Sequence, residues 1–227
     1  MLASGGFNRH PTRRGEWIPG IDAAWCPGAP GHTGSAQDLA LAAGAQFGDG
    51  ALSPSFWAPV SLRTRADGSR AVFPHFMMDR GKPGMLTVNQ AGERFVNEAT
   101  SYHLFALAMQ AANVTSPSIP AWLICDAAAL KRYGLGMLRP GARPGSKALA
   151  PFLTDGYITQ GETLHVLAEK LGMAQAALAG TVARFNASVE AGSNPCLGAL
   201  SEAPFFCGTS LPRRHRRCAG ARHRRQR

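Results

Sequence analysis

The clearest hydrophobic pattern in the chain is helical and lies between residues 162 and 192. Leu164, Leu167 and Leu171 recur at the spacing of an amphipathic helix, and Gly172 follows them as a left-handed C-cap. A second stripe ends before Gly192 and consists of Leu178, Val182, Phe185 and Val189. The spacing predicts two helices whose apolar faces belong to the core.

Shorter apolar runs between residues 52 and 125 alternate with turn residues and predict β-strands. Two hairpins are expected, Leu62–Phe73 around the turn Ala66-Asp67-Gly68 and Met85–Val96 around the turn Asn89-Gln90-Ala91-Gly92. Ala121–Cys125 is apolar throughout and predicts a buried strand.

Two more helices are predicted, one before these strands and one between the second hairpin and the strand Ala121–Cys125. The first runs from about Gly34 to Ala45 and ends near Gly48, with a stripe of small and apolar residues at Ala36, Leu39, Ala40 and Ala43. The second runs from Tyr102 to Ala112, with Leu104, Leu107, Ala108 and Ala111 on one face. The sequence Thr33-Gly34-Ser35 before the first helix is either an ordinary N-cap or a set of backbone N–H donors that faces an anion.

Charge is distributed unevenly along the 227 residues. The net charge is +10, but eight arginines lie between Leu211 and Arg227, so the preceding 210 residues are nearly neutral. The tail has no apolar periodicity, which predicts disorder. An Arg-rich tail could be a nucleic-acid-binding arm, but it has no interleaved aromatic residues. We favour a shifted reading frame through GC-rich DNA, which yields Arg, Ala, Gly, Pro and His.

Cysteine usage and hydropathy exclude several classes. The five cysteines have no Cys-x-x-Cys spacing, so neither a disulfide framework nor a zinc site is expected. No apolar run reaches the length of a membrane span, and the N-terminus has no signal-peptide pattern. The expectation is a soluble, cytoplasmic protein that has no membrane partner. The sequence does not indicate an oligomeric state.

Candidate chemistry is concentrated in the segment Gly92–His103. It holds five groups that can hold or move protons, Arg94, Asn97, Glu98, Tyr102 and His103. The alternative is a solvated hairpin end. His32, His75 and His103 could each be catalytic, but an isolated histidine is more often a surface group or a satisfied core group.

The same segment carries a family resemblance. Arg-Phe-Val-Asn-Glu followed by Ser-Tyr-His resembles the substrate-domain segment of the FAD-dependent fumarate reductase and 3-ketosteroid dehydrogenase superfamily, in particular its Δ1-dehydrogenase-like branch. Four further elements stand in the family's order. They are Leu2-Ala3-Ser4-Gly5-Gly6-Phe7, Gly31-His32-Thr33-Gly34-Ser35-Ala36, Asn194-Pro195-Cys196-Leu197-Gly198 and Ala203-Pro204-Phe205-Phe206.

The resemblance implies a fold and a division of the chain. The fold class is α+β, the substrate (cap) domain of a flavoprotein oxidoreductase with remnants of the FAD-binding α/β domain. Residues 1–50 would be a remnant of the FAD-binding domain, 51–192 the substrate domain, 193–210 a partial return to the FAD domain, and 211–227 a disordered basic tail. No Gly-x-Gly-x-x-Gly motif occurs in the 227 residues. The chain is therefore interpreted as a fragment with a deletion before Asn194.

The resemblance also implies FAD as cofactor and a steroid-like ketone as the small-molecule substrate. Tyr102 would be the catalytic base, with Glu98 and Arg94 tuning it or relaying protons. Ala3, Ser4, Gly5, Gly6, Thr33, Gly34 and Ser35 would contact the flavin. Phe206 stands where the family has a second tyrosine, and it has no hydroxyl. We expect this chain to retain little FAD, since the phosphate-binding motif is absent.

Two other functions compete with a ketone dehydrogenase. A fumarate-type dicarboxylate reductase would require arginines clustered around Glu98, and the sequence places Tyr102-His103 where that branch has a further arginine. A non-catalytic protein that binds nucleic acid through its basic tail is the second. Translating the two other reading frames after the Phe206 codon, and the DNA before Met1, would discriminate between these readings.

Overall fold

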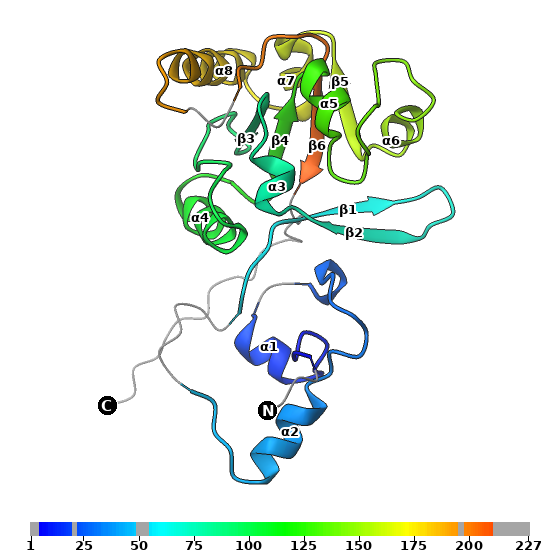
Figure 1. The fold of residues 1–227 in the computed structure, drawn as a ribbon, viewed down its shortest axis with the longest axis vertical. Coiled ribbons are helices and arrows are strands. Elements are labelled where there is room, and N and C mark those ends of the chain that lie inside the picture. The colour runs from blue at the N-terminus through cyan, green and yellow to red at the C-terminus, as the bar shows by residue number, and fades with distance from the viewer. Residues whose placement is uncertain (1–4, 20–21, 49–54, 195–197, 211–227) are drawn as a thin grey trace.

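The protein is described by a computed structural model that covers residues 5–19, 22–48, 55–194 and 198–210. The helices are α1 (Arg13–Trp17), the 3₁₀ helix η1 (Ala23–Trp25), α2 (Ser35–Ala42), α3 (Met77–Arg80), α4 (Tyr102–Thr115), α5 (Ala127–Tyr133), α6 (Ala150–Thr154), α7 (Leu164–Leu171) and α8 (Gln175–Glu190). The strands are β1 (Val60–Thr64), β2 (Arg70–Pro74), β3 (Met85–Val88), β4 (Ala121–Cys125), β5 (Ile158–Gly161) and β6 (Phe205–Ser210). Figure 1 shows their arrangement.

A four-stranded antiparallel sheet forms the centre of the larger part of the molecule. Its strand order is β3-β4-β6-β5. β6 lies inside this sheet, between β4 and β5, and the assignment of residues 193–210 to a partial return to the FAD domain stays a prediction. The last described strand thus packs with the segment 85–161. Its side chains take part in both apolar clusters of the core, Cys207 in one and Phe206 in the other.

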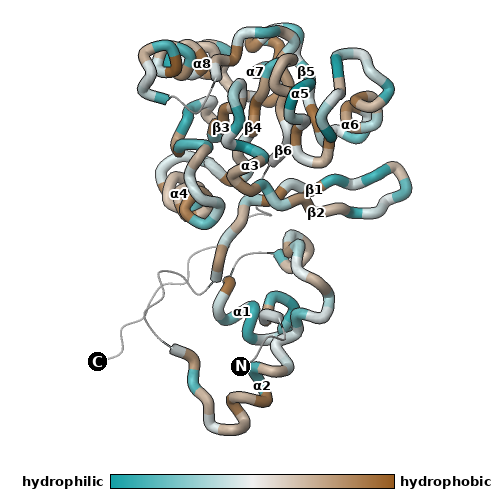
Figure 2. Tube along the Cα trace, in the orientation of Figure 1, coloured by the Kyte–Doolittle hydropathy of each residue, from teal (hydrophilic) through white to brown (hydrophobic). Residues whose placement is uncertain are grey.

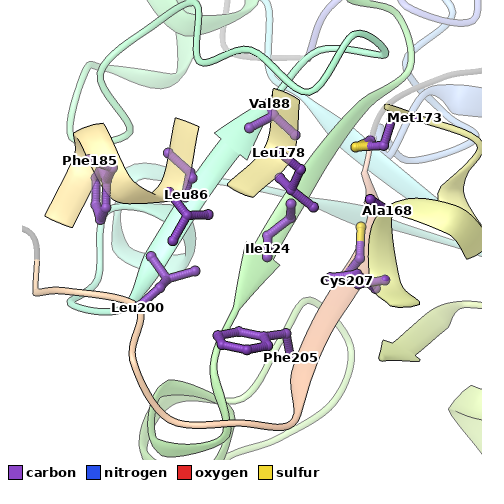
Figure 3. Packing of buried hydrophobic residues seen from close by; sticks show 12 residues of the cluster. Leu86, Val88, Ile124, Ala168, Met173, Leu178, Phe185, Leu200, Phe205 and Cys207 are labelled. Carbon is purple, nitrogen blue, oxygen red and sulfur yellow. The ribbon is translucent and has the colours of Figure 1, made fainter. Parts of the chain in front are cut away.

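The two faces of the sheet are covered by different elements. α7 and α8 pack on one face, where Ala168, Leu178 and Phe185 meet the apolar side chains of β3, β4 and β6 (Figure 3). The segment from α5 to β5 covers the other face, where Leu130, Leu135 and Tyr157 are among the buried residues. The predicted stripes of α7 and α8 are confirmed as core, because their apolar residues are buried in this cluster or packed against it.

Local turn and cap signals are confirmed where neighbouring residues decide them. β1 and β2 form the predicted antiparallel hairpin, in which Val60 pairs with Pro74. Gly172 and Gly192 have φ angles of 72° and 71°, so both adopt the left-handed conformation expected after a helix. Tyr102 begins α4 as predicted, and the Ser101 side chain accepts a hydrogen bond from the backbone N–H of Leu104 at 3.4 Å.

The predicted hairpin over Met85–Val96 is wrong. The turn forms, because the side chain of Asn89 accepts hydrogen bonds from the N–H groups of Ala91 and Glu93. β3, however, pairs with β4, and residues 94–96 form no strand. On the edge of β3, the backbone N–H of Thr87 donates to the carboxylate of Glu98 at 2.7 Å. A side chain therefore satisfies a backbone donor that a second hairpin strand would have paired.

Two helical faces also differ from the prediction. α4 buries Phe105, Ala106 and Met109, whereas Leu104 and Ala111 are exposed. α2 ends at Ala42 instead of near Gly48, and it has no buried residue. Hydrophobic residues therefore occur both on the strands of the sheet and along the exposed α2 (Figure 2). Among the described residues, no helix is long and apolar enough to cross a membrane.

Candidate functional site

The carboxylate of Glu98 is a fixed, fully buried group. Its side chain is 0% exposed and forms an ion pair with Arg94, whose Nη2 lies 2.6 Å from Oε2. Arg94 Nε adds a bond of 3.1 Å to the same oxygen, while the Thr87 N–H holds the other oxygen. Because both carboxylate oxygens are engaged by the protein, Glu98 positions the chain between β3 and α4.

A second arginine beside Glu98 was not among the site residues predicted from the sequence. Arg80, at the end of α3, is buried and donates to the backbone carbonyl oxygens of Glu98 and Thr100, the latter at 2.7 Å. Its guanidinium carbon lies 3.9 Å from the centre of the Phe105 ring. Burial lowers the pKa of Arg80 to about 10, while Glu98 and Asp79 act in the opposite direction. It stays charged at neutral pH and joins α3 to the start of α4.

Tyr102 contacts Phe76, which directly precedes α3. We define the exposed residues Phe76, Met77, Met78 and Tyr102 as the apolar shelf. The Tyr102 side chain is 37% exposed and its ring centre lies 5.3 Å from that of Phe76 in an edge-on contact. Met78 is 75% exposed. The structure thus brings Arg94 and Glu98 together, and places the phenol of Tyr102 on an exposed apolar surface.

The predicted flavin-contacting residues are described only in part, since Ala3 and Ser4 lie outside the described residues. Gly5 has a φ of 88°, and a Cβ built on it would lie 2.9 Å from the His32 ring. A Cβ on Gly6 or Gly31 would meet no atom within 4 Å, so the backbone is open to close approach at these positions. Thr33 and Ser35 are exposed, with their hydroxyl oxygens 2.7 Å apart. The backbone at Gly6 and Gly31 is thus uncovered, and the flavin contacts of this segment stay a prediction.

Gly34 has a different environment from its neighbours Thr33 and Ser35. It is buried, has a φ of 78°, and precedes α2. A Cβ built there would lie 3.0 Å from the side chains of both Arg13 and His10, a tight contact. These two residues contact the Asp38 carboxylate, at 2.5 Å from Arg13 and 3.3 Å from His10, and the Arg13 hydrogen bond lowers the pKa of Asp38. Gly34 therefore allows α2 to join the N-terminal segment.

Four side chains, three of them buried, form a connected polar network. With a proton on Nδ1, His75 donates to the carboxylate of Asp79, and its Nε2 accepts from the Ser61 hydroxyl at 2.8 Å. Ser61 in turn accepts from Tyr157 at 2.6 Å, and the Tyr157 oxygen accepts from the N–H of Met137 at 3.1 Å. Burial raises the pKa of Tyr157, so the phenol keeps the proton that this arrangement needs.

This network ties the β1–β2 hairpin and α3 to the sheet. A Cβ at Gly136 would lie 2.2 Å from the Tyr157 hydroxyl, so only glycine allows that approach. The sequence signal was limited to His75 and Asp79 at a spacing of four residues, because Tyr157 lies 96 positions from Ser61. Ser61, His75 and Tyr157 are all buried. The network is thus a structural link between β1, α3 and the segment that precedes β5.

The described residues contain no group of His, Cys, Asp and Glu that could hold a metal ion. A cavity of about 190 Å³ lies between α4, the segment leading into β1, and the N-terminal segment. A second, polar hollow lies beside Arg94 and is lined by Glu93, Arg184 and other side chains of α8. Arg94 therefore borders a hollow that is separate from the apolar cavity.

Comparison with known proteins gives one family match and several relatives. Residues 1–220 match the family described as FAD binding domain. A 4-oxocyclohex-2-ene-1-carboxylate 5-dehydrogenase from Sinomonas cyclohexanicum is 36% identical over 200 residues, covering 87% of this chain and 33% of that protein. A 3-oxosteroid 1-dehydrogenase from Mycolicibacterium smegmatis is 29% identical over 241 residues, covering 93% of this chain and 40% of that protein.

A solved structure gives a matching result. The 3-ketosteroid delta1-dehydrogenase from Sterolibacterium denitrificans, in complex with 1,4-androstadiene-3,17-dione, superposes with a TM-score of 0.72 at 28% identity. The match covers 92% of this chain and 40% of that one. The resemblance inferred from the sequence motifs is confirmed. The chain spans between a third and two-fifths of the length of these relatives.

Proposed function

The chain belongs to the FAD-binding-domain family, and from that membership we propose that it forms the substrate domain of a dehydrogenase that acts on adjacent carbons of a cyclic ketone. The observation that carries the proposal is the position of Tyr102, whose phenol is exposed on the apolar shelf. An apolar surface suits hydrocarbon rings, and a phenol beside it can exchange a proton with them.

The relatives support a ketone in a six-membered ring. Three of them are named for dehydrogenation of such compounds: 4-oxocyclohex-2-ene-1-carboxylate, 3-oxosteroids and 4-oxocyclohexanecarboxylate. Removing two hydrogens from neighbouring carbons requires a base for one proton and an acceptor for a hydride. FAD, when bound, supplies the hydride acceptor. We assign the proton to Tyr102.

Tyr102 needs a defined position to act as a base, because a phenol has a pKa near 10 in water. Ser101 caps the helix that Tyr102 begins, and the ring packs edge-on against Phe76. Arg80 links the carbonyl of Thr100 to α3, on which the apolar shelf lies. We assign Glu98 and Arg94 to positioning this segment. The sequence-based expectation had also allowed Glu98 and Arg94 to relay protons, and the present assignment leaves that role out.

A dicarboxylate reductase is less well supported. The sequence led us to expect no arginine cluster around Glu98, yet Arg80 and Arg94 both lie beside it. Arg80 is 2% exposed and donates to backbone carbonyls, while Arg94 is paired with Glu98. Both guanidinium groups thus have protein acceptors, and the hollow that Arg94 borders lies beside α8. Cyclic ketones therefore remain the proposed substrates.

Turnover by the chain supplied with excess FAD tests the proposal. Reduction of an electron-accepting dye should depend on a six-membered ring ketone, and Tyr102→Phe should lower the rate by about 10²–10⁴-fold, the range for loss of a general base. Tyr133→Phe is the matched control, because Tyr133 packs against the core cluster around Leu130. Unchanged turnover in Tyr102→Phe would contradict the assignment of Tyr102 as the base.

A further inference from the structure

The segment from α5 to α6, residues 127–154, concentrates positive charge on the surface. It contains five basic residues and no acidic residue. Residues 1–210 carry a net charge of +2 in total, so the rest of that range carries −3. All five basic side chains are exposed, and we define them as the basic patch: Lys131, Arg132, Arg139, Arg143 and Lys147.

Backbone hydrogen bonds hold the two halves of the basic patch together. The N–H of Gly141 donates to the carbonyl oxygen of Lys131 at 2.7 Å, which joins the loop with Arg139 and Arg143 to the end of α5. The same loop is closed by Ser146, whose hydroxyl oxygen accepts from the N–H of Arg143 at 3.2 Å. Figure 1 shows this segment beside β5, an edge strand of the sheet. The five cations therefore belong to one continuous region.

The protein itself does not neutralise the basic patch. Within the described part of the chain, none of the five side chains makes an ion pair or a hydrogen bond, and the guanidinium carbon of Arg132 lies 5.3 Å from the ring centre of Tyr133. The acidic residues that flank the segment are engaged elsewhere: Asp126 is buried and caps α5, and Asp155 pairs with Arg63 at 2.7 Å. Exposed cations without such partners create a positive potential that attracts anions.

The surroundings of the basic patch favour a lipid surface over nucleic acid. Single-stranded nucleic acid binds to exposed aromatic rings on which its bases stack, whereas Tyr133 and Phe152, the aromatic residues of the segment, pack against the core. A duplex is read by a helix or β-ribbon that enters a groove, but the basic patch lies on turns and on the last turn of the seven-residue α5. Clusters of about four to eight Lys and Arg beside a membrane bind its anionic headgroups.

We propose that the basic patch holds the protein on an anionic lipid surface through attraction between its cations and the headgroups. The choice of a lipid partner rests on the proposed function, because an apolar ring ketone partitions into a bilayer and a dehydrogenase at the surface meets it there. No large apolar side chain is exposed within residues 127–154, so the contact is electrostatic and salt reverses it. The net negative charge of the other residues before Leu211 is repelled by the same surface, which orients the basic patch toward it.

Lysine acetylation of the full 227-residue chain, read by mass spectrometry, tests the proposal without interference from the Arg-rich tail, because residues 211–227 contain no lysine. Vesicles of equal parts phosphatidylserine and phosphatidylcholine should slow the acetylation of Lys131 and Lys147 severalfold. Lys170 is the matched control, since it is exposed on α7 and donates to the carbonyl oxygen of Gln160 at 2.8 Å, and its rate should not change. Molar salt should remove the protection.

Substitutions then separate the basic patch from the tail. Arg139→Gln, Arg143→Gln and Lys147→Gln together should weaken vesicle binding by about 10²-fold, or about fivefold for each cation. Replacing the eight tail arginines by glutamine should leave Lys131 and Lys147 protected, and loss of their protection there would overturn the proposal.

The remaining outcomes decide the partner. Equal protection of Lys170, or protection by vesicles of phosphatidylcholine alone, would overturn the electrostatic docking of the basic patch. Protection by a single-stranded oligonucleotide at a lower phosphate concentration than by the anionic vesicles would overturn the choice of lipid. Because no turnover is measured, a failure of dehydrogenase activity does not decide this result.

Discussion

The sheet region and the N-terminal segment are stabilised in different ways. In the sheet region, residues from β3 to β6 and from α5, α7 and α8 enclose two apolar clusters on opposite faces. In the described residues 5–48, only Arg13, Ile18 and Gly34 are buried. Within this segment, arginine side chains donate hydrogen bonds to backbone carbonyls, such as Arg9 to the carbonyl oxygen of Cys26 at 2.9 Å.

The two regions differ in whether the apolar stripe of a helix is covered by a core. In α7 and α8 an apolar stripe meets a sheet, so each large side chain removes apolar area from water. In α2 a similar stripe meets no core, and Leu39 is 73% exposed. Aromatic edges partly take the place of a core, since Trp17 contacts both Phe7 and Phe47. The same sequence pattern therefore has very different energetic consequences in the two regions.

The largest expected effect is a direct contrast between one leucine in each region. Leu167→Ala should lower the free energy of unfolding by about 2–5 kcal/mol, because it opens a cavity in the cluster on the sheet. Leu39→Ala should change it by less than about 0.5 kcal/mol. Alanine and leucine have similar helix propensities, so the pair isolates burial. Urea unfolding measures both, and equal losses would break the comparison.

An intermediate effect is expected from the buried network of Ser61, His75 and Tyr157. Ser61→Ala and Tyr157→Phe should each cost about 1–3 kcal/mol, because each leaves a buried partner without a hydrogen bond. In a double-mutant cycle the losses should not add, since the two hydroxyls contact each other. Strict additivity would mean that the network does not couple the hairpin to the sheet.

The smallest effect, at neutral pH, concerns the thiol of Cys207 in β6. Burial raises the pKa of this thiol above its ordinary value of 9.0. The folded state therefore binds the proton more tightly. The contribution of this thiol to the free energy of unfolding is fully present below pH 9.0 and decreases as the pH rises above it. Cys207→Ala should reduce this alkaline fall by roughly 1.4 kcal/mol per pH unit.

Urea unfolding between pH 7 and 10.5 measures this slope in the parent and in Cys207→Ala. The small packing loss of the substitution does not depend on pH, so the slope alone is compared. Cys125 and Tyr157 are buried with raised pKa values as well, and the variant should therefore keep a reduced slope. An identical slope in both proteins would show that the Cys207 thiol is not the group that titrates.

Much of the local structure was predictable because adjacent residues decide it. The stripes and glycine caps of α7 and α8 lie within single helices, and the β1–β2 hairpin follows from its own turn. The pairing of Arg94 with Glu98 is also local, at a separation of four residues. The motif Arg-Phe-Val-Asn-Glu indicated the family only together with the other elements that stand in the family's order.

Tertiary structure decided the remaining features, because each depends on competition between distant segments. β3 pairs with β4 instead of residues 94–96, and Glu98 then satisfies the free edge of β3. α4 buries the face with Phe105 because Arg80 and the sheet lie on that side. The Ser61–Tyr157 contact and the cavity at Trp25 and Trp57 join segments that the sequence separates widely. Periodicity identifies an apolar face, but only packing determines what covers it.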